Sequence, residues 1–249
     1  MLELDQVTKR FGRVTVADGL SLHLGAEEIV GMVGPNGAGK TSVFGIISGD
    51  LAPDEGRVIF DGQVLNQLDA AARCRIGIGR TYQVPRPFEQ MTVFENVLVA
   101  AQAGAGYRRR AAHELAYSTL TDTGLDRMAN RPAAQCGLLD RKRLELARAL
   151  ATRPRLLLLD EVAAGLTDRE VAELISIVNG ARRASGFAVL WVEHVVRTLV
   201  ATVQRLVCLD AGAIIADGEP EAVLQDPKVK DVYMGTELQS SGAEAEAGT

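Results

Sequence analysis

Apolar and polar residues alternate near the start of the chain and then give way to a continuous apolar run. Leu20, Leu22 and Leu24 are separated by polar residues, which predicts a strand with one buried face. The run from Ile29 to Val33 is apolar throughout, which predicts a strand buried on both faces. This run leads directly into a glycine-rich loop, and residues 41–49 have the length and pattern of a short helix. We therefore expect a strand, a loop and a helix in succession.

A hairpin pattern follows over residues 53–65. The segment PDEGRVIFDGQVL contains two strand-like stretches separated by Asp61 and Gly62, a pair that is typical of two-residue hairpin turns. We expect a small antiparallel sheet beside the glycine-rich loop.

The middle third of the chain changes to a helical pattern, between about residues 92 and 152. Thr92 and Glu95 have the spacing of a capping box, and the stretch RRRAAHELAYSTLTDTG ends at Gly124 as a helix would. We therefore expect a helical insertion.

Apolar strands return in the last third. Residues 155–161 read RLLLLDE, an apolar run that ends at two carboxylates, and residues 187–192 predict another buried strand. Thr167 and Glu170 form a second capping box between them. One face of the helix that follows is marked by Val171, Leu174, Ile175 and Val178. Because apolar strands alternate with helices, we expect an α/β core of mainly parallel sheet with helices on both faces.

These patterns predict one domain over residues 1–235. Its α/β core would carry the small antiparallel β subdomain and a helical subdomain over about residues 85–152. Residues 236–249 are small, polar and acidic, with too little apolar surface to pack, so we expect a disordered tail.

Composition narrows the class of protein. The chain has 249 residues, a hydrophobic share of 47% and a net charge of -5, which gives it enough apolar matter for a substantial core and no electrostatic footprint for nucleic acid. The run Arg108 to Arg110 is the local exception, and we expect it to be a solvated helix start. Cys74, Cys136 and Cys208 are far apart, which argues against a disulfide framework or a zinc site and favours a reducing cytosol.

The hydrophobic pattern also indicates how the chain could associate with a membrane. The first residues lack the basic start and apolar stretch of a signal peptide, and no uncharged run approaches the roughly 18 residues that span a bilayer. If the protein serves a membrane, we expect it to dock from one side.

The glycine-rich loop GPNGAGKT matches the phosphate-binding pattern G-x-x-x-x-G-K-[ST], between a predicted strand and a predicted helix. Its glycines let backbone N–H groups surround phosphate oxygens, and the helix dipole favours negative charge. Lys40 would contact the outer phosphates and Thr41 would hold Mg2+. The expected ATP-binding residues are Gly34, Pro35, Asn36, Gly37, Ala38, Gly39, Lys40, Thr41 and Ser42. The loop alone does not separate kinases, GTPases and transporter ATPases.

Two adjacent carboxylates, Asp160 and Glu161, end the apolar run of residues 155–161. Nucleotide hydrolysis needs one carboxylate for the Mg2+ shell and another to orient or deprotonate the attacking water. We assign Asp160 to the metal and Glu161 to the water, although such a pair elsewhere is often only a solvated helix cap.

With these motifs in order, the chain resembles the nucleotide-binding domains of ABC transporters, from its start to about residue 235. In GRTYQ, Gln83 stands where the family has a glutamine that touches Mg2+ or water and relays to the membrane subunit. His194, in WVEHVV, matches the histidine that reaches the γ-phosphate. The resemblance thus implies a catalytic set of Glu161, His194 and Gln83, with Thr41, Gln83 and Asp160 at the metal.

The resemblance adds further residues. Phe11 stands where the family stacks an aromatic ring on adenine, with Val16 nearby; a core phenylalanine is the alternative. Residues 163–168, AAGLTD, resemble the D-loop that crosses to the second protomer.

Within the family the chain looks most like the branched-chain amino acid importer type, in the stretches GRTYQVPRPFEQMTVFENV, RKRLELARALATRPRLLLLDE and IIADGEPEAVLQDPKVKDVYMG. This resemblance implies an ATPase that powers uptake and partners that comprise transmembrane permease subunits and a second ATP-binding subunit. It also implies a peripheral location on the cytoplasmic face of the inner membrane.

One segment departs from the family pattern. The family's LSGGQ or LSYGQ segment falls at Cys136 to Asp140, which here reads CGLLD. Gly137 replaces a serine that would contact the γ-phosphate across the dimer, and Leu139 replaces a glycine that permits close backbone approach. The N-terminus of the following helix and the basic residues 141–143 remain as candidates for a contact in trans. This departure favours a heterodimer over a homodimer.

Other interpretations stay open at this point. A soluble phosphate-loop kinase would need an acceptor pocket and would not need Gln83, His194 and the D-loop. A non-transport ABC protein of DNA repair or translation usually carries a long coiled coil or two fused domains. A regulatory subunit with weak hydrolysis is compatible with CGLLD.

Overall fold

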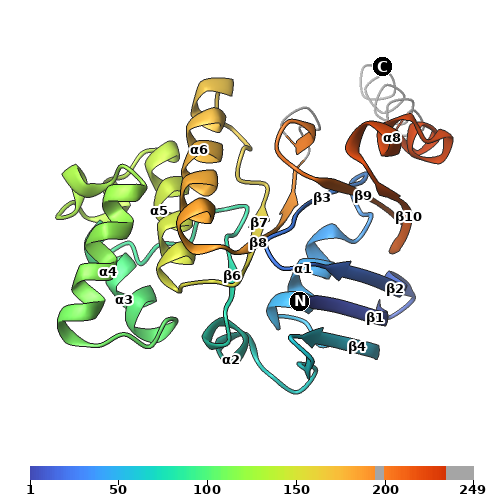
Figure 1. Cartoon of the computed structure of the whole chain (residues 1–249), viewed down its shortest axis with the longest axis horizontal. Helices are drawn as coiled ribbons and strands as arrows, with labels where there is room; N and C mark the ends of the chain where they lie inside the picture. The colour runs from blue at the N-terminus through green and yellow to red at the C-terminus, as the bar shows by residue number, and fades with distance from the viewer. Residues whose placement is uncertain (194–198, 234–249) are drawn as a thin grey trace, which may run out of the picture.

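Figure 1 shows the computed structural model, which describes residues 1–193 and 199–233. Helices α3 to α6 lie on one side of a central sheet, and strands β1, β2 and β4 lie on the other. None of the helices in the described ranges is long and apolar enough to cross a membrane. The expected tail, residues 236–249, lies outside the described residues, and the proposed division into domains stays a prediction.

The central sheet has six strands in the order β10-β9-β3-β8-β7-β6. Its parallel strands are β3 (Ile29–Val33), β6 (Ile78–Arg80), β7 (Leu156–Asp160), β8 (Ala188–Val192) and β9 (Arg205–Asp210), and β10 (Ala213–Gly218) pairs antiparallel with β9. Val192 on β8 is level with Met32 on β3 and with Asp160 on β7. The carboxyl ends of these strands therefore meet at one edge of the sheet, where both the glycine-rich loop and the acid pair begin.

The apolar run in β7 is buried on both faces, as predicted. Leu156 and Leu158 pack in the cluster that contains Phe44 of α1 (Lys40–Ser48), whereas Leu157 and Leu159 pack with residues of α5 (Leu138–Ala151) and α6 (Asp168–Ser185). The two sets alternate because successive strand residues point to opposite faces. Helices thus cover both faces of the sheet, which confirms the α/β fold.

A second, antiparallel sheet has the order β2-β1-β4-β5. Its strands are β1 (Leu2–Phe11), β2 (Val14–Leu24), β4 (Glu55–Phe60) and β5 (Gln63–Val64). The predicted turn is present, with Asp61 and Gly62 both at positive φ (49° and 80°), as a tight hairpin requires. Leu20, Leu22 and Leu24 face inward and share a hydrophobic cluster with α1. This sheet therefore supports the helix that follows the phosphate loop.

Between β6 and β7 the chain forms a helical unit with its own small core. It comprises α3 (Val93–Ala103), α4 (Arg109–Asp122), two short 3-10 turns (Asp126–Met128 and Ala133–Gln135) and α5. The capping boxes predicted at Thr92 and at Thr167 are both present, at the starts of α3 and α6. Two further short helices are α2 (Ala70–Arg75) and α8 (Pro220–Gln225).

Candidate functional site

The glycine-rich loop is held in a backbone conformation that a side chain would prevent. Gly39 has φ +105°, and a Cβ atom there would lie 2.2 Å from the carbonyl oxygen of Val16. A Cβ atom on Gly34 would lie 2.1 Å from the carbonyl oxygen of Leu209. These contacts explain why the two outer glycines of the motif are needed here: the loop is packed closely against β2 and β9.

Lys40, the first residue of α1, points back across this loop. Its Nζ donates hydrogen bonds to the carbonyl oxygens of Gly34 (2.7 Å) and Pro35 (2.9 Å). Burial lowers the pKa of Lys40, while the charges of Glu161 and Asp160 act in the opposite direction. The ammonium group is therefore a buried cation placed at the loop, which suits an anionic ligand.

A cavity of about 340 Å³ lies over the loop. It is lined by Val16, Asn36, Gly37, Ala38, Gly39, Lys40, Thr41, Ser42, Gln83 and Glu161. The structure thus brings most of the predicted phosphate-binding residues together with two of the three predicted catalytic residues. Gln83 comes from the segment after β6 and Glu161 from the segment after β7, more than 70 residues apart in sequence.

The acid pair occupies the carboxyl end of β7. Glu161 has φ +48°, an uncommon conformation for a residue other than glycine, and its N–H donates to the carbonyl oxygen of Val192 (3.0 Å). Its Oε2 accepts a hydrogen bond from Nε2 of Gln83. Asp160 pairs instead with Arg80 (2.9 Å), and its side chain is only 4% exposed. The turn at Glu161 therefore directs the two carboxylates to different places.

The predicted metal ligands share a second cavity. Thr41, Gln83 and Asp160 are among the residues that line this space of about 470 Å³. Their hydroxyl, amide and carboxylate oxygens are the ligand types that Mg2+ prefers. The residues present therefore fit a magnesium ion bound together with a phosphate.

Two predicted residues remain less defined. Phe11 ends β1 and is 50% exposed, so it is not a core phenylalanine; Nζ of Lys9 lies 5.4 Å from its ring centroid. Phe11 does not line the cavity over the loop, whereas Val16 does. His194 lies outside the described residues.

The departing segment, Cys136 to Asp140, is mostly helical. Gly137 is the N-cap of α5, with φ -69° and no side-chain cap, and the helix begins at Leu138. We expected a helix only after this segment, but no proline or turn residue prevents its last three residues from joining α5. Leu138 is 49% exposed and lies beside Gly165 of the D-loop segment.

The basic residues after this segment, which we considered for a contact in trans, make contacts within this chain. Arg141 donates to the carbonyl oxygens of Cys136 and Ala134, both at 2.9 Å. Lys142 is buried and donates to the carbonyl oxygen of Glu161 (3.2 Å), and Arg143 pairs with Glu173 (2.5 Å). All three cations are therefore engaged within the chain, because α5 turns them toward neighbouring carbonyl and carboxylate groups.

Three charged residues contact the site, and two of them, Arg80 and Glu193, were not singled out from the sequence. Arg80 pairs with Asp160, Lys142 contacts Glu161, and the buried Glu193 accepts from the N–H of Ala163 (2.8 Å). Burial raises the pKa of Glu193 and lowers that of Lys142. The sequence carried one signal for them: Arg80 and Glu193 each stand directly at the end of an apolar strand.

Comparison with known proteins agrees with this geometry. A family model described as "ABC transporter" matches residues 17–164, and one described as "Branched-chain amino acid ATP-binding cassette transporter" matches residues 213–238. The high-affinity branched-chain amino acid transport ATP-binding protein BraF of Pseudomonas aeruginosa is 36% identical, covering 94% of this chain and 98% of BraF. LivG of Escherichia coli, with the same descriptive name, is 34% identical with the same coverage. The lipopolysaccharide export system ATP-binding protein LptB of Haemophilus influenzae is 32% identical, covering 96% of this chain and 99% of LptB.

Solved structures give the same result. The ADP conformation of MJ1267, an ATP-binding cassette of an ABC transporter, superposes with a TM-score of 0.84 at 29% identity, covering 94% of this chain and 98% of that one. A dimeric post-hydrolysis state of the cassette MJ0796, bound to ADP and Pi, gives a TM-score of 0.80 at 25% identity over 88% and 99% of the two chains. The first family match spans the phosphate loop, Gln83 and the acid pair. We conclude that this chain belongs to the ABC transporter family, as one of its ATP-binding and ATP-hydrolysing subunits.

Proposed function

We propose that Glu161 activates the attacking water in ATP hydrolysis and that Gln83 orients it. The observation that carries this proposal is the hydrogen bond from Gln83 to Glu161 in the wall of the cavity over the phosphate loop. A general base must lie within reach of the water and the phosphate. The hydrogen bond from Gln83 limits the orientations that the Glu161 carboxylate can adopt. Because Gln83 belongs to the segment after β6, this bond also links the carboxylate to that segment.

The rest of the loop binds and neutralises the phosphates. The N–H groups at the start of α1 would donate to the phosphate oxygens, and Lys40, which lines the same cavity, would bring a positive charge to the outer phosphates. Mg2+, held by Thr41, Asp160 and Gln83, would neutralise the charge that develops during phosphoryl transfer. His194 matches the histidine that contacts the γ-phosphate in the family, and we assign it the same role here.

The substrate class of the transporter follows from the C-terminal part of the chain. BraF and LivG are named for branched-chain amino acid transport, but LptB is named for lipopolysaccharide export and is almost as similar. Similarity along the whole chain therefore does not select a substrate. The match of residues 213–238 to the branched-chain amino acid cassette family favours import of branched-chain or related amino acids.

The chain would act at the cytoplasmic face of the inner membrane, against permease subunits. Three exposed large apolar residues follow Gln83: Val84 (69% exposed), Phe88 (46%) and Met91 (38%). Exposed apolar side chains gathered in one segment are typical of a protein interface. Because this segment continues directly from Gln83, a permease contact there would reach the catalytic residues through the backbone.

The second ATP-binding subunit is proposed to differ from this chain. The dimeric MJ0796 structure shows that cassettes of this fold pair. In such a pair each nucleotide lies between one phosphate loop and the partner's LSGGQ-type segment. Gly137 offers no hydroxyl, and the three cations that follow are engaged within the chain. A heterodimer would supply this chain's nucleotide with an intact segment from the partner.

The altered segment Cys136 to Asp140 also favours one alternative function, that of a nucleotide-binding subunit with weak hydrolysis. The two functions differ in where turnover occurs, since a regulatory subunit would bind ATP in its own loop without hydrolysing it rapidly.

Transport reconstituted with permease subunits, the second ATP-binding subunit and candidate branched-chain amino acids tests the main proposal. Uptake should depend on this chain and on ATP, and it should be lost with Glu161→Gln. Uptake that persists unchanged without the chain would refute the transport role, whereas uptake that needs the chain but tolerates Glu161→Gln would favour the regulatory alternative.

A further inference from the structure

Arg80 is a largely buried cation that joins two carboxylates at the metal side of the site. Its guanidinium donates to Oδ2 of Asp160 (2.9 Å) through one terminal nitrogen, and to Oδ2 of Asp50 (2.8 Å) and Oγ of Ser48 (2.9 Å) through the other. The side chain is 9% exposed and that of Asp160 is 4% exposed. Asp50 is more open, at 37%. Asp160 and Arg80 therefore form the buried half of this bridge.

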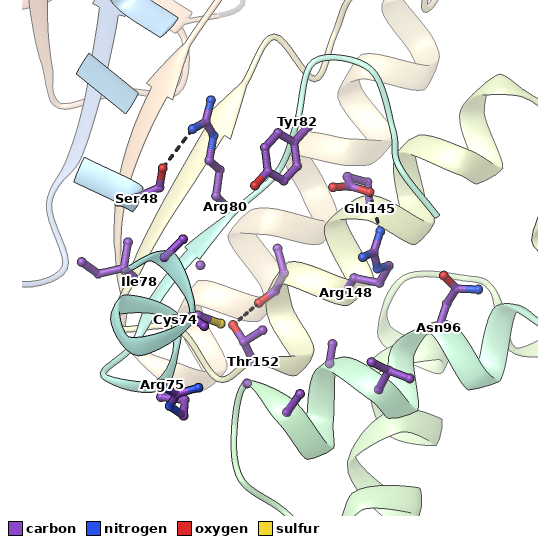
Figure 2. Close-up of a pocket in the computed structure, with 18 of the residues that line it drawn as sticks. Ser48, Cys74, Arg75, Ile78, Arg80, Tyr82, Asn96, Glu145, Arg148 and Thr152 are labelled. Atoms are coloured by element: carbon purple, nitrogen blue, oxygen red, sulfur yellow. Dashed lines mark hydrogen bonds and ion pairs between the residues drawn. The ribbon is translucent and has the colours of Figure 1, made fainter. Parts of the chain in front are cut away.

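Aromatic rings hold the guanidinium from the sides. It lies 5.8 Å from the ring centroid of Phe44 and 4.9 Å from that of Tyr82. Figure 2 shows Arg80 next to Tyr82, with its hydrogen bond to Ser48, at one end of the groove of about 310 Å³ that runs along α2, α3 and α5. Among the described residues nothing accepts from Nε, which is buried. The guanidinium is thus held by hydrogen bonds from both of its terminal nitrogens and by the two neighbouring aromatic rings.

The backbone fixes the distance between Arg80 and Asp160. Arg80 is the last residue of β6 and pairs with Leu158 of β7. The next residue, Thr81, donates its N–H to the carbonyl oxygen of Leu158 (2.9 Å), and its hydroxyl accepts from the N–H of Asp160 (3.2 Å). Thr81 therefore joins the ends of the two strands next to the ion pair, which makes the pair a feature of the sheet rather than a chance surface contact.

Arg80 also lines the cavity that contains Thr41, Gln83 and Asp160. A guanidinium that occupies one carboxylate oxygen fixes the rotation of that carboxylate and leaves its other oxygen for a ligand. Its charge at the same time opposes the binding of any further cation to the same group. Two positive charges at one carboxylate repel each other, and at a buried group water screens this repulsion only partly.

We propose that Arg80 is a positioning residue for Asp160, which fixes the orientation of this carboxylate and reduces its affinity for a divalent cation. The proposal rests on the proposed role of Asp160 as a Mg2+ ligand. Arg80 makes release of the metal easier after hydrolysis, and it keeps the buried Asp160 charge balanced when no metal is bound.

Thermal unfolding of the full chain in saturating ADP, with MgCl2 titrated from an EDTA baseline, tests this proposal without measuring turnover. Bound ligand raises the unfolding midpoint in proportion to the logarithm of its concentration over Kd. Arg80→Met should unfold at a lower temperature in EDTA, because Asp160 loses its partner. We define the Mg2+ midpoint as the Mg2+ concentration that gives a set rise in unfolding temperature over the EDTA baseline. For Arg80→Met this Mg2+ midpoint should be about tenfold lower than for the native chain.

Two further variants separate charge from packing. Arg80→Lys keeps the cation, so its Mg2+ midpoint should stay within about twofold of the native value. Arg80→Gln removes the charge and should follow Arg80→Met, which also covers the case in which Arg80→Met does not fold. Arg57→Met, which removes an exposed ion pair with Asp5, should leave the Mg2+ midpoint unchanged.

The outcomes are distinct. An unchanged or higher Mg2+ midpoint in Arg80→Met or Arg80→Gln overturns the inference, and so does a low midpoint in Arg80→Lys. A native chain that ADP stabilises in EDTA but that gains nothing from Mg2+ overturns the metal role of Asp160 and this inference with it. A native chain that ADP does not stabilise at all overturns the proposed nucleotide site itself.

Discussion

Two helices in this molecule begin at a glycine, and the two starts differ in almost every physical respect. Gly39 caps α1 and Gly137 caps α5, both without a side-chain cap. Gly39 is in a left-handed conformation, and a Cβ atom there would meet the carbonyl oxygen of Val16 at 2.2 Å, whereas Gly137 has φ -69° and open space around it. The first start requires glycine and the second does not.

Their charges differ as well. Lys40 at the first start faces the loop and lines the phosphate cavity. At the second start, Arg141, Lys142 and Arg143 are bound to groups of the same chain. A helix N-terminus is therefore insufficient for a phosphate site on its own. What makes the first one a site is the closely packed glycine loop, the cation of Lys40 and the carboxylate of Glu161 in the wall of the same cavity.

The largest effect that tests this comparison is expected at Glu161. Glu161→Gln keeps the size and most hydrogen bonds of the side chain but removes the base, so ATP turnover should fall by about a thousandfold while ATP still binds. Phosphate release and bound nucleotide would be measured on the complex with the second subunit. Undiminished turnover would remove Glu161 from the role of base.

Repair of the second start should give the next largest effect. Gly137→Ser with Leu139→Gly restores the hydroxyl and the close backbone approach, so turnover by the chain alone should rise about a hundredfold. Gly137→Ala with Leu139→Gly is the matched control, because it lacks only the hydroxyl. A repaired chain no faster than this control would show that the serine is not what the segment lacks.

Replacing each of the two N-cap glycines by alanine should change the free energy of unfolding by different amounts. Gly39→Ala adds left-handed strain and a backbone clash, and should reduce the free energy of unfolding by at least about 2 kcal/mol. Gly137→Ala should cost less than about 1 kcal/mol, because it meets nothing and changes only the cap preference. Urea unfolding of both variants gives the difference, and equal costs would contradict the comparison.

The smallest expected effect is on the pH dependence of stability, and it comes from buried charged residues that lie between the phosphate site and the start of α5. Lys142, the fifth residue of α5, contacts the backbone of Glu161, and Glu193 accepts from Ala163 in the D-loop segment. Burial raises the pKa of Glu193 above its ordinary value of 4.5. The folded chain therefore binds this proton more tightly than the unfolded chain, so its contribution to stability is full below pH 4.5 and is lost as the pH rises through the raised value.

Glu193→Gln cannot titrate, so its free energy of unfolding should decline less than that of the native chain over this pH range. Urea unfolding at several pH values between 4.5 and 8 measures the two slopes. Equal slopes would mean that Glu193 does not contribute to this pH dependence.

The sequence predicted the parts of this molecule that are specified locally. The apolar run Ile29 to Val33 is β3 residue for residue, and the capping boxes at Thr92 and Thr167 start helices as expected. Spacing within a strand or a helix turn depends on nearby residues, so it can be read from one short stretch. The phosphate loop is also a short continuous stretch, so its pattern could be recognised in the same way.

Contacts between distant segments could not be predicted in this way. The resemblance placed Gln83 and Glu161 in one site, but no local pattern indicates that Arg80 pairs with Asp160 or that Lys142 reaches Glu161. These partners are 80 and 19 residues apart, and only the order of strands in the sheet and the packing of α5 bring them together. The engagement of Arg141 to Arg143 was missed for the same reason.

The central claim is that this chain's own phosphate loop is complete while the segment it offers to a partner is not. The most direct test is ATP turnover by the purified chain alone, compared with turnover in complex with a second ATP-binding subunit that has an intact LSGGQ-type segment. The account predicts a rate about a hundredfold higher in the complex, and this gain should be lost when Glu161→Gln is introduced into this chain. Equal turnover by the chain alone and by the complex would contradict the account.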